Sequence, residues 1–413
     1  MGRTERFSAI FGFCLALAVV SGCVTTSTAP PFVKPFRPDR IVAVGDIHGS
    51  FDGLVSILKE TKIIDDNHRL IGGRTLLIQV GDVLDRGADV KPVMDLLMSL
   101  QHQAESTGGR VVVTMGNHET MNIVGARQYT NPDAYKSFAG SGSEQKQKKA
   151  FERWQAFFGA SATAGGESPE AVKQKWMTNH PPGFVEYTEA MGPEGVYGKW
   201  LRSLPTVYRY GPNIFLHAGI SPAEEAMTLS EINQSVSDEI EKFDQIKSFL
   251  LEKGYVEPYF SLSEIISVVD SIVSAADTQK LSPSLAAALP KIKEIKTYFD
   301  TFYDQSPLMS DDGPLWFRGL AWWPDDKLVP YIPVWLQQND AWRIVVGHTP
   351  QPDGKIKSRL DGDIFLIDTG MNSAYFKGGQ ASALEIKDDD VSAVYATGEG
   401  ALFPPPPVRF PAR

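Results

Sequence analysis

Three short segments of this sequence set acidic, amide and imidazole side chains beside glycine. They are Gly45–Gly49 (GDIHG), Gly81–Gly87 (GDVLDRG) and Gly116–Glu119 (GNHE). Two later segments, Leu216–Gly219 (LHAG) and Val346–His348 (VGH), each add one histidine. Oxygen and imidazole ligands together suit ions such as Mn, Fe or Zn, and a glycine lets an ion or a phosphate approach the backbone closely. The pattern therefore predicts a metal site.

The side chains that these segments present are Asp46, His48, Asp82, Asn117 and His118, with His217 and His348 from the two later segments, and six of them are expected to be metal ligands. Two cations about 3.5–4 Å apart need a shared ligand, and Asp82, in the middle segment, is the natural bridging carboxylate. Such a pair of ions would acidify a bound water to hydroxide and hold phosphoryl oxygens for in-line displacement. No side-chain nucleophile is then needed, which agrees with a chain whose two cysteines, Cys14 and Cys23, both precede the body.

The ligand segments can meet only if strand ends bring them together. Apolar runs predict strands that end in these segments, at Ile41–Asp46, Thr75–Asp82, Arg110–Asn117, Asn213–Gly219 and Arg343–His348. Helical spacing predicts helices between the first three strands, at Phe51–Glu60 and Val90–Gln101. This βαβαβ opening implies parallel strands with right-handed crossovers, whose carboxyl ends line one crevice.

The rest of the chain predicts further helices and a second group of strands. Ser143–Gly159 is amphipathic, and we interpret its KQKK run as a solvated helix face. Residues 222–306 carry apolar stripes at helical spacing and predict a helical insert. Late strands, expected to form a second sheet with Arg343–His348, lie at Asp363–Asp368, Ala383–Lys387 and Val391–Ala396. The expected fold class is α/β.

Composition excludes several classes of protein. The chain has 413 residues, of which 42% are hydrophobic and 22% charged, near the average of soluble globular proteins. It is therefore neither mostly disordered nor a multi-span membrane protein. Lys+Arg 40 against Asp+Glu 50 gives a net charge of -10, so we expect no broad basic surface and no nucleic-acid partner.

The first residues are typical of an export signal. Arg3 and Arg6 precede the apolar run Phe7–Val20, which has the length of a signal-peptide core. Val20–Cys23 (VSGC) resembles the lipobox of bacterial lipoproteins, which implies a signal peptide over residues 1–22 and lipid on Cys23; an ordinary signal peptide or an uncleaved anchor is the alternative. We expect a Thr/Ser/Pro-rich tether at 23–39, a folded domain at 40–400 and a Pro-rich tail at 401–413. This predicts a periplasm-facing protein of the bacterial envelope, anchored to the outer membrane.

The motifs resemble those of a known family. GDIHG, GDVLDRG and GNHE, followed by HAG and GH in the same order, resemble the signatures of the phosphoprotein phosphatase branch of calcineurin-like metallophosphoesterases. DGPLWFRG (Asp312–Gly319) and IDTGM (Ile367–Met371) are most similar to the Shewanella-like protein phosphatases. The resemblance implies the layered metallophosphoesterase fold: βαβ units, two sheets flanked by helices, and a helical insert.

The resemblance also implies a role for each motif residue. Asp46 and His48 would hold the first metal with Asp82 as the bridge. The second metal would be completed by Asn117, His217 and His348. His118 would be the general acid, held by Asp85. The substrate phosphate would be bound by Arg86, Asn117 and, as a further candidate, Arg318.

The implied function is a dinuclear-metal phosphomonoesterase that acts on phosphorylated proteins or small phosphoesters. Phosphotyrosine is favoured, because Shewanella-like relatives are associated with it. Ala218 stands where eukaryotic Ser/Thr phosphatases have a glycine, and Tyr375 is only a loose counterpart of their toxin-binding loop. Two alternatives remain: a nucleotide phosphohydrolase of the dinucleoside tetraphosphatase type, which would need a further basic cluster, and a non-catalytic envelope lipoprotein, which would have lost ligands. The oligomeric state stays open.

Overall fold

The computed structural model describes residues 36–276, 282–398 and 400–404. The expected signal peptide, Cys23, most of the tether (residues 23–35) and most of the tail (residues 405–413) lie outside the described residues. Within these ranges, no helix combines the length and the apolar character that crossing a membrane requires.

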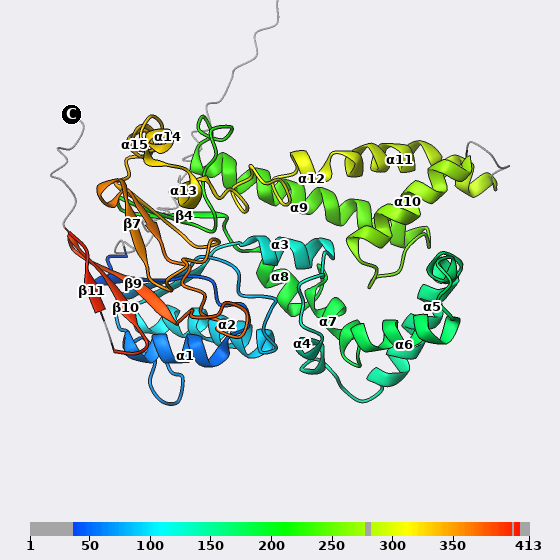
Figure 1. The fold of residues 1–413 in the computed structure, drawn as a ribbon, viewed down its shortest axis with the longest axis horizontal. Helices are drawn as coiled ribbons and strands as arrows, with labels where there is room; N and C mark the ends of the chain where they lie inside the picture. Colours follow the sequence, from blue (N-terminus) through cyan, green and yellow to red (C-terminus); the bar gives the residue numbers. More distant parts are fainter. Residues whose placement is uncertain (1–35, 277–281, 399, 405–413) are drawn as a thin grey trace, which may run out of the picture. The chain divides into compact units, whose positions relative to one another are not determined.

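The first sheet begins with the three parallel strands that the sequence predicts. They are β1 (Arg40–Val44), β2 (Thr75–Gln79) and β3 (Arg110–Val113). The predicted helices connect them as α1 (Phe51–Glu60) and α2 (Val90–Thr107), and each buries an apolar face in the same core as the sheet (Figure 1). Each strand ends before its ligand segment, so Asp46, His48 and Asp82 lie in loops that follow β1 and β2, and Asn117 lies at the start of the helix that follows β3.

Two of the late strands complete this first sheet, which corrects the expectation that they belong to the second. β9 (Ser382–Lys387) pairs antiparallel with β1, and β10 (Asp390–Tyr395) and β11 (Gly400–Leu402) continue the sheet beyond it. The physical reason is that β1 would otherwise expose a long unpaired edge, which folded proteins avoid. The predicted position of each strand was right, but its sheet was wrong.

The second sheet has the order β4-β5-β6-β8-β7. β5 (Asn213–Leu216), β6 (Arg343–Val346) and β8 (Ile364–Leu366) are parallel, whereas β4 (Val207–Tyr210) and β7 (Lys357–Arg359) pair antiparallel at its two edges. Its apolar residues form a core of their own with nearby helices. These helices include α13 (Gly319–Trp322), α14 (Asp325–Leu328) and α15 (Ile332–Gln338).

Two helical sections extend beyond the sheets (Figure 1). The expected insert contains α9 (Leu229–Glu252), α10 (Leu262–Ala276), α11 (Pro283–Asp300) and α12 (Phe302–Gln305). The section between β3 and β4 is more helical than the sequence predicts: besides the expected α5 (Ser143–Thr163), it contains α3 (Asn117–Val124), α4 (Pro132–Lys136), α6 (Pro169–Asn179), α7 (Phe184–Met191) and α8 (Val196–Arg202). The lysines of the KQKK run are exposed on α5, as expected.

Candidate metal centre

The loops after the parallel strands of both sheets meet at one small cavity. It has a volume of about 50 Å³. Among the residues that line it are His48, Asp82, Arg86, Asn117, His118, Arg318 and His348. The structure thus brings together motif residues that are separated by up to 302 positions, as expected from the convergence of the strand ends.

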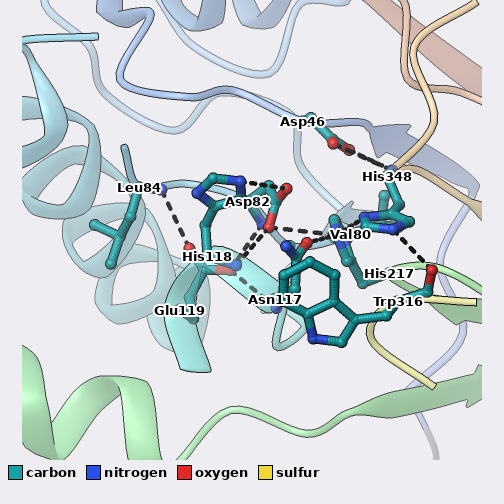
Figure 2. Close-up of polar contacts among 12 residues, drawn as sticks. Asp46, Val80, Asp82, Leu84, Asn117, His118, Glu119, His217, Trp316 and His348 are labelled. Atoms are coloured by element: carbon teal, nitrogen blue, oxygen red, sulfur yellow. Dashed lines mark hydrogen bonds and ion pairs between the residues drawn. The ribbon is translucent and has the colours of Figure 1, made fainter. Parts of the chain in front are cut away.

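Asp82 lies at the middle of this cluster (Figure 2). Its Oδ2 atom is 3.6 Å from Nε2 of His48, and its Oδ1 atom is 3.3 Å from Nε2 of His217. Two groups of three side chains have the spacing of a metal site, and Asp82 belongs to both. The first group is His48, Asp82 and His118, and the second is Asp82, His217 and His348. One carboxylate shared between two groups is what a pair of adjacent divalent ions requires.

Backbone carbonyls orient three of the imidazoles. A carbonyl oxygen only accepts hydrogen bonds, so the ring nitrogen that faces it carries the proton. His48 donates from Nδ1 to the carbonyl oxygen of Leu84 at 2.9 Å, and His217 donates from Nδ1 to that of Val80 at 2.9 Å. His348 donates from Nε2 to the carbonyl oxygen of Trp316 at 3.0 Å. The other nitrogen of each ring is left with a free lone pair in the site, which is the state that a metal ligand needs. Burial also lowers the pKa of His48 to about 4 and that of His348 well below its usual value, which keeps both rings neutral.

The Asn117 amide completes the second group. Its oxygen lies 2.8 Å from Nε2 of His217, which is itself 3.0 Å from Nδ1 of His348. Because His217 donates from its other nitrogen, two acceptors face each other here. Either the amide turns over and donates to His217, or a cation lies among the three atoms. The donor set therefore fits a divalent ion.

Asp46 lies at the edge of the cluster. Its carboxylate accepts hydrogen bonds from the backbone N–H of His348 at 2.9 and 3.1 Å, and its Oδ2 atom is 4.0 Å from Nε2 of His48. The group that contains His48 and Asp82 has His118 as its third member, whereas the sequence predicts Asp46 there.

A second buried acid, Asp368, accompanies Asp46, and the sequence reasoning missed it. Burial, then Asp368 and Asp82, raise the pKa of Asp46 well above its usual value, and burial raises the pKa of Asp368 to about 6. A divalent cation that binds here would offset the repulsion between these closely spaced buried carboxylates. The sequence signal that could have identified it is its position, because Asp368 follows strand β8 just as the other candidate ligands follow their strands.

His118 and Asp85 form a buried pair. Nδ1 of His118 donates to Oδ2 of Asp85 at 2.7 Å, and Asp85 also accepts hydrogen bonds from Asn122 and Thr130. Burial favours a neutral His118, but Asp82 and Asp85 outweigh it and raise the pKa of the imidazole. The pair therefore keeps a protonated imidazole beside the cavity, as a general acid requires.

Glu119 supports the Asp82 loop, a role that the sequence reasoning also missed. Its carboxylate accepts the backbone N–H groups of Asp82, Val83, Leu84 and Gly116 at 2.8–3.1 Å. Burial and the charge of Asp82 raise its pKa to about 7. Glu119 thus fixes the conformation of the loop that carries Asp82.

Comparisons with known proteins agree with this geometry. The family described as Calcineurin-like phosphoesterase matches residues 39–253 of the chain. Shewanella-like protein phosphatase 1 of Plasmodium berghei (strain Anka) is 27% identical over 361 residues, which are 86% of this chain and 74% of that protein. Shewanella-like protein phosphatase 2 of Arabidopsis thaliana is 29% identical over 217 residues, 50% of this chain and 53% of that protein.

A solved structure has the same fold. The cold-active protein-tyrosine phosphatase of a psychrophile Shewanella species superposes with a TM-score of 0.55 at 20% identity, covering 90% of this chain and 83% of that one. The predicted fold class, two sheets flanked by helices, is confirmed.

Proposed function

Because this chain belongs to the calcineurin-like phosphoesterase family, we propose that it is a protein phosphatase that uses two divalent metal ions. The observation that carries the proposal is that Asp82 belongs to both candidate metal groups. Beside it lie His118 and Asp85, which are hydrogen-bonded to each other. The relatives from Plasmodium berghei and Arabidopsis thaliana are protein phosphatases by name, which supports a phosphorylated protein as the substrate. The predicted enzyme class, a metal-dependent phosphoester hydrolase, is confirmed by the family.

The residues that would hold the ions are Asp46, His48, Asp82, Asn117, His217 and His348. When bound, divalent ions supply positive charge to phosphoryl oxygens and lower the pKa of water. The chain supplies neutral imidazoles whose lone pairs already face the site, and the shared carboxylate of Asp82. We propose Mn²⁺ as the first ion to test, because mixed oxygen and imidazole ligands suit it.

The chain's own residues bind the phosphate and move the proton. Arg86 and Arg318 line the cavity and donate hydrogen bonds to phosphate oxygens. Arg318 is held in place because its Nη1 atom donates to the backbone oxygen of His348 at 2.8 Å and to Thr349 Oγ1 at 3.1 Å. With Nδ1 of His118 bonded to Asp85, the proton on Nε2 is the one that passes to the leaving oxygen of the alcohol or phenol.

The test is a panel of phosphopeptides carrying phosphoserine, phosphothreonine or phosphotyrosine, assayed with Mn²⁺, Fe²⁺ or Zn²⁺. We expect turnover that depends on the added ion and stops after exhaustive chelation. Diadenosine tetraphosphate is the matched control substrate. Undiminished turnover without metal, or hydrolysis of the dinucleotide alone, would contradict the proposal.

Within that panel we propose a preference for phosphotyrosine. The Shewanella protein that shares the fold is a protein-tyrosine phosphatase, and half-exposed aromatic residues, Tyr129 and Tyr375, lie at the mouth of the site. The expected result is a kcat/KM for phosphotyrosine peptides at least several-fold above that for phosphoserine peptides of the same sequence. Equal values would refute this preference and leave the protein phosphatase proposal intact.

We further propose that the enzyme is a lipoprotein of the bacterial envelope, facing the periplasm from the outer membrane. The support is the apolar run followed by Val20–Cys23 in the sequence. Expression of the full chain with radiolabelled palmitate is expected to label the protein, and Cys23→Ser is expected to remove the label. A labelled Cys23→Ser variant, or an unlabelled natural sequence, would refute the anchor.

A further inference from the structure

Arg86 reaches the cavity without an acidic partner. Among the residues that the structure describes, none forms an ion pair with Arg86, and its buried Nε atom has no hydrogen-bond partner. The neighbouring Asp85 is turned away, because its oxygens accept hydrogen bonds from His118, Asn122 and Thr130. The positive charge of Arg86 is therefore not neutralised by a carboxylate.

Two tyrosine rings hold the guanidinium group instead. The Cζ atom of Arg86 lies 3.9 Å from the ring centroid of Tyr129 and 4.3 Å from that of Tyr375. Tyr129 is 39% exposed and Tyr375 is 46% exposed. In the described part of the chain neither tyrosine hydroxyl makes a hydrogen bond, so the contact is made by the ring face. We call these two residues the tyrosine pair.

Both members of the tyrosine pair are tied to the loops of the site. The backbone N–H of Arg86 donates to the carbonyl oxygen of Tyr129 at 3.0 Å. The ring of Tyr129 lies 5.5 Å from that of His118, and the ring of Tyr375 lies 5.6 Å from that of His48. The two rings come from loops far apart in the sequence, which converge on one arginine at the edge of the candidate metal centre.

The position of the tyrosine pair matches the path of a substrate. Arg86 and Tyr375 line both the small metal cavity and a second cavity of about 720 Å³ beside it, and Tyr129 lines the larger one. A phosphate group that enters the small cavity would leave its organic part in the larger cavity. The guanidinium group thus stands at the junction, where its N–H groups can reach phosphate oxygens.

We propose that Tyr129 and Tyr375 are positioning residues that hold Arg86 ready for the substrate phosphate. An aromatic face attracts a guanidinium cation without occupying its N–H groups. A carboxylate partner would occupy those groups and cancel the charge that phosphate must meet. Because an arginine side chain loses rotamer freedom when it binds a ligand, holding it beforehand favours affinity. The inference rests on the proposed function, since it requires a phosphate in the metal cavity.

The test measures the affinity of the Mn²⁺-loaded protein for inorganic phosphate by isothermal titration calorimetry. Tyr129→Leu and Tyr375→Leu remove a ring but keep apolar bulk, and each is expected to weaken phosphate binding by about 3- to 10-fold. Tyr129→Phe and Tyr375→Phe keep the ring and are expected to stay within about twofold of the natural protein. With p-nitrophenyl phosphate, the Leu variants are expected to raise KM more than they lower kcat.

The same substitutions in an Arg86→Ala background isolate the mechanism. If the rings act through Arg86, the Leu substitutions cause no further loss of phosphate affinity there. An equal loss with and without Arg86, or full affinity in the Leu variants, would overturn the inference. Tyr129→Gln and Tyr375→Gln repeat the affinity measurement with a polar side chain in place of the ring. For every variant, the amount of bound Mn²⁺ and the melting temperature show whether the protein is folded. Phosphate affinities that follow the expected pattern without any turnover would refute the proposed function alone.

Discussion

At the scale of single residues, the site is built on strained backbone. Five site residues other than glycine have a left-handed φ between 49° and 67°: His48, Asp82, Asp85, Arg86 and His348. Each such conformation costs roughly 1–3 kcal/mol and persists only where neighbours fix it. Glu119 fixes Asp82 through the backbone N–H groups of its loop, and buried hydrogen bonds fix Asp85. The strain is compensated by polar contacts that aim the functional side chains at one point.

Asp82→Asn tests the shared carboxylate. The amide keeps the shape of the side chain but lacks the second charged oxygen, so it is a poor bridge between two cations. We expect turnover of p-nitrophenyl phosphate to be abolished and the bound metal to fall below that of the natural protein, as measured by elemental analysis. A variant that holds two ions and keeps the full rate would show that Asp82 is not the bridge.

His118→Asn separates two roles that the geometry allows. As the general acid, His118 contributes about 10²–10⁴-fold to kcat, and its loss should leave the metal content unchanged. As a ligand in the His48–Asp82–His118 group, its loss should remove one ion. We expect the first result, because Asp85 directs the ring and keeps it protonated. Loss of one ion together with activity would assign His118 to the metal instead.

Most of the site residues were predictable because three motifs carry them at the ends of predicted strands. Asp368 and Glu119 were not assigned a role, although Glu119 is part of a motif. Their roles depend on contacts with residues far away in the sequence: Asp368 lies beside Asp46, and Glu119 binds the Asp82 loop. Spacing within a segment carries no information about such contacts. The left-handed backbone of the site was equally invisible, because it is imposed by the surroundings.

At the scale of elements, the spacing of apolar residues predicted where helices and strands lie in the sequence better than it predicted which strands pair with each other. The spacing of Phe51–Glu60 predicted α1 with the bounds that the structure has. β9 was predicted at nearly the right residues but in the wrong sheet. A strand's apolar residues show that it is buried, whereas its neighbour is decided by which edge of which sheet is free. The short helices α4, α7 and α8 were missed because each is too short to show a clear period.

Helix α9 carries a lysine whose charge is disfavoured in the folded state. Burial and the neighbouring Arg127 and Arg202 lower the pKa of Lys247 from 10.5 to about 7, although Asp244 opposes them. In the unfolded chain the lysine keeps its ordinary pKa. The folded state is therefore penalised fully below pH 7, and the penalty disappears as the pH rises toward the unfolded value.

Lys247→Met removes this penalty, so we expect a higher melting temperature at about pH 6 and a gain that shrinks by about pH 9.5. The control is Lys293→Met on α11, where the lysine is exposed and little change is expected at either pH. The measurement is thermal unfolding followed by circular dichroism. A gain that is the same at both pH values would mean that packing of the methionine, and not the charge of Lys247, is responsible.

At the scale of the whole molecule, the candidate metal centre connects the two sheets. Asp46, His48, Asp82 and Asn117 follow strands of the first sheet, whereas His217 and His348 follow strands of the second. Even without ions, the two sets are joined by hydrogen bonds, such as that from the backbone N–H of His348 to Asp46. Bound ions would add ligand bonds across the same junction. Metal binding should therefore stabilise the fold as a whole as well as enable the chemistry.

Removal of the metal should lower the stability of the protein by an amount that follows from linkage. An ion that binds the folded chain alone adds about 2.7 kcal/mol to the free energy of unfolding at a concentration 100 times its dissociation constant. We expect the melting temperature to rise with Mn²⁺ concentration and to fall after chelation. We also expect Mn²⁺ to slow hydrogen exchange at the ends of β1 and β2 in the first sheet and, to the same extent, at the ends of β5 and β6 in the second. His217→Asn, directly after β5 of the second sheet, should remove most of the Mn²⁺ effect in both sheets because the shared centre is lost. If this variant lost protection only around β5 and β6 while the first sheet still responded fully to Mn²⁺, the ions would bind each sheet independently and the centre would not connect them.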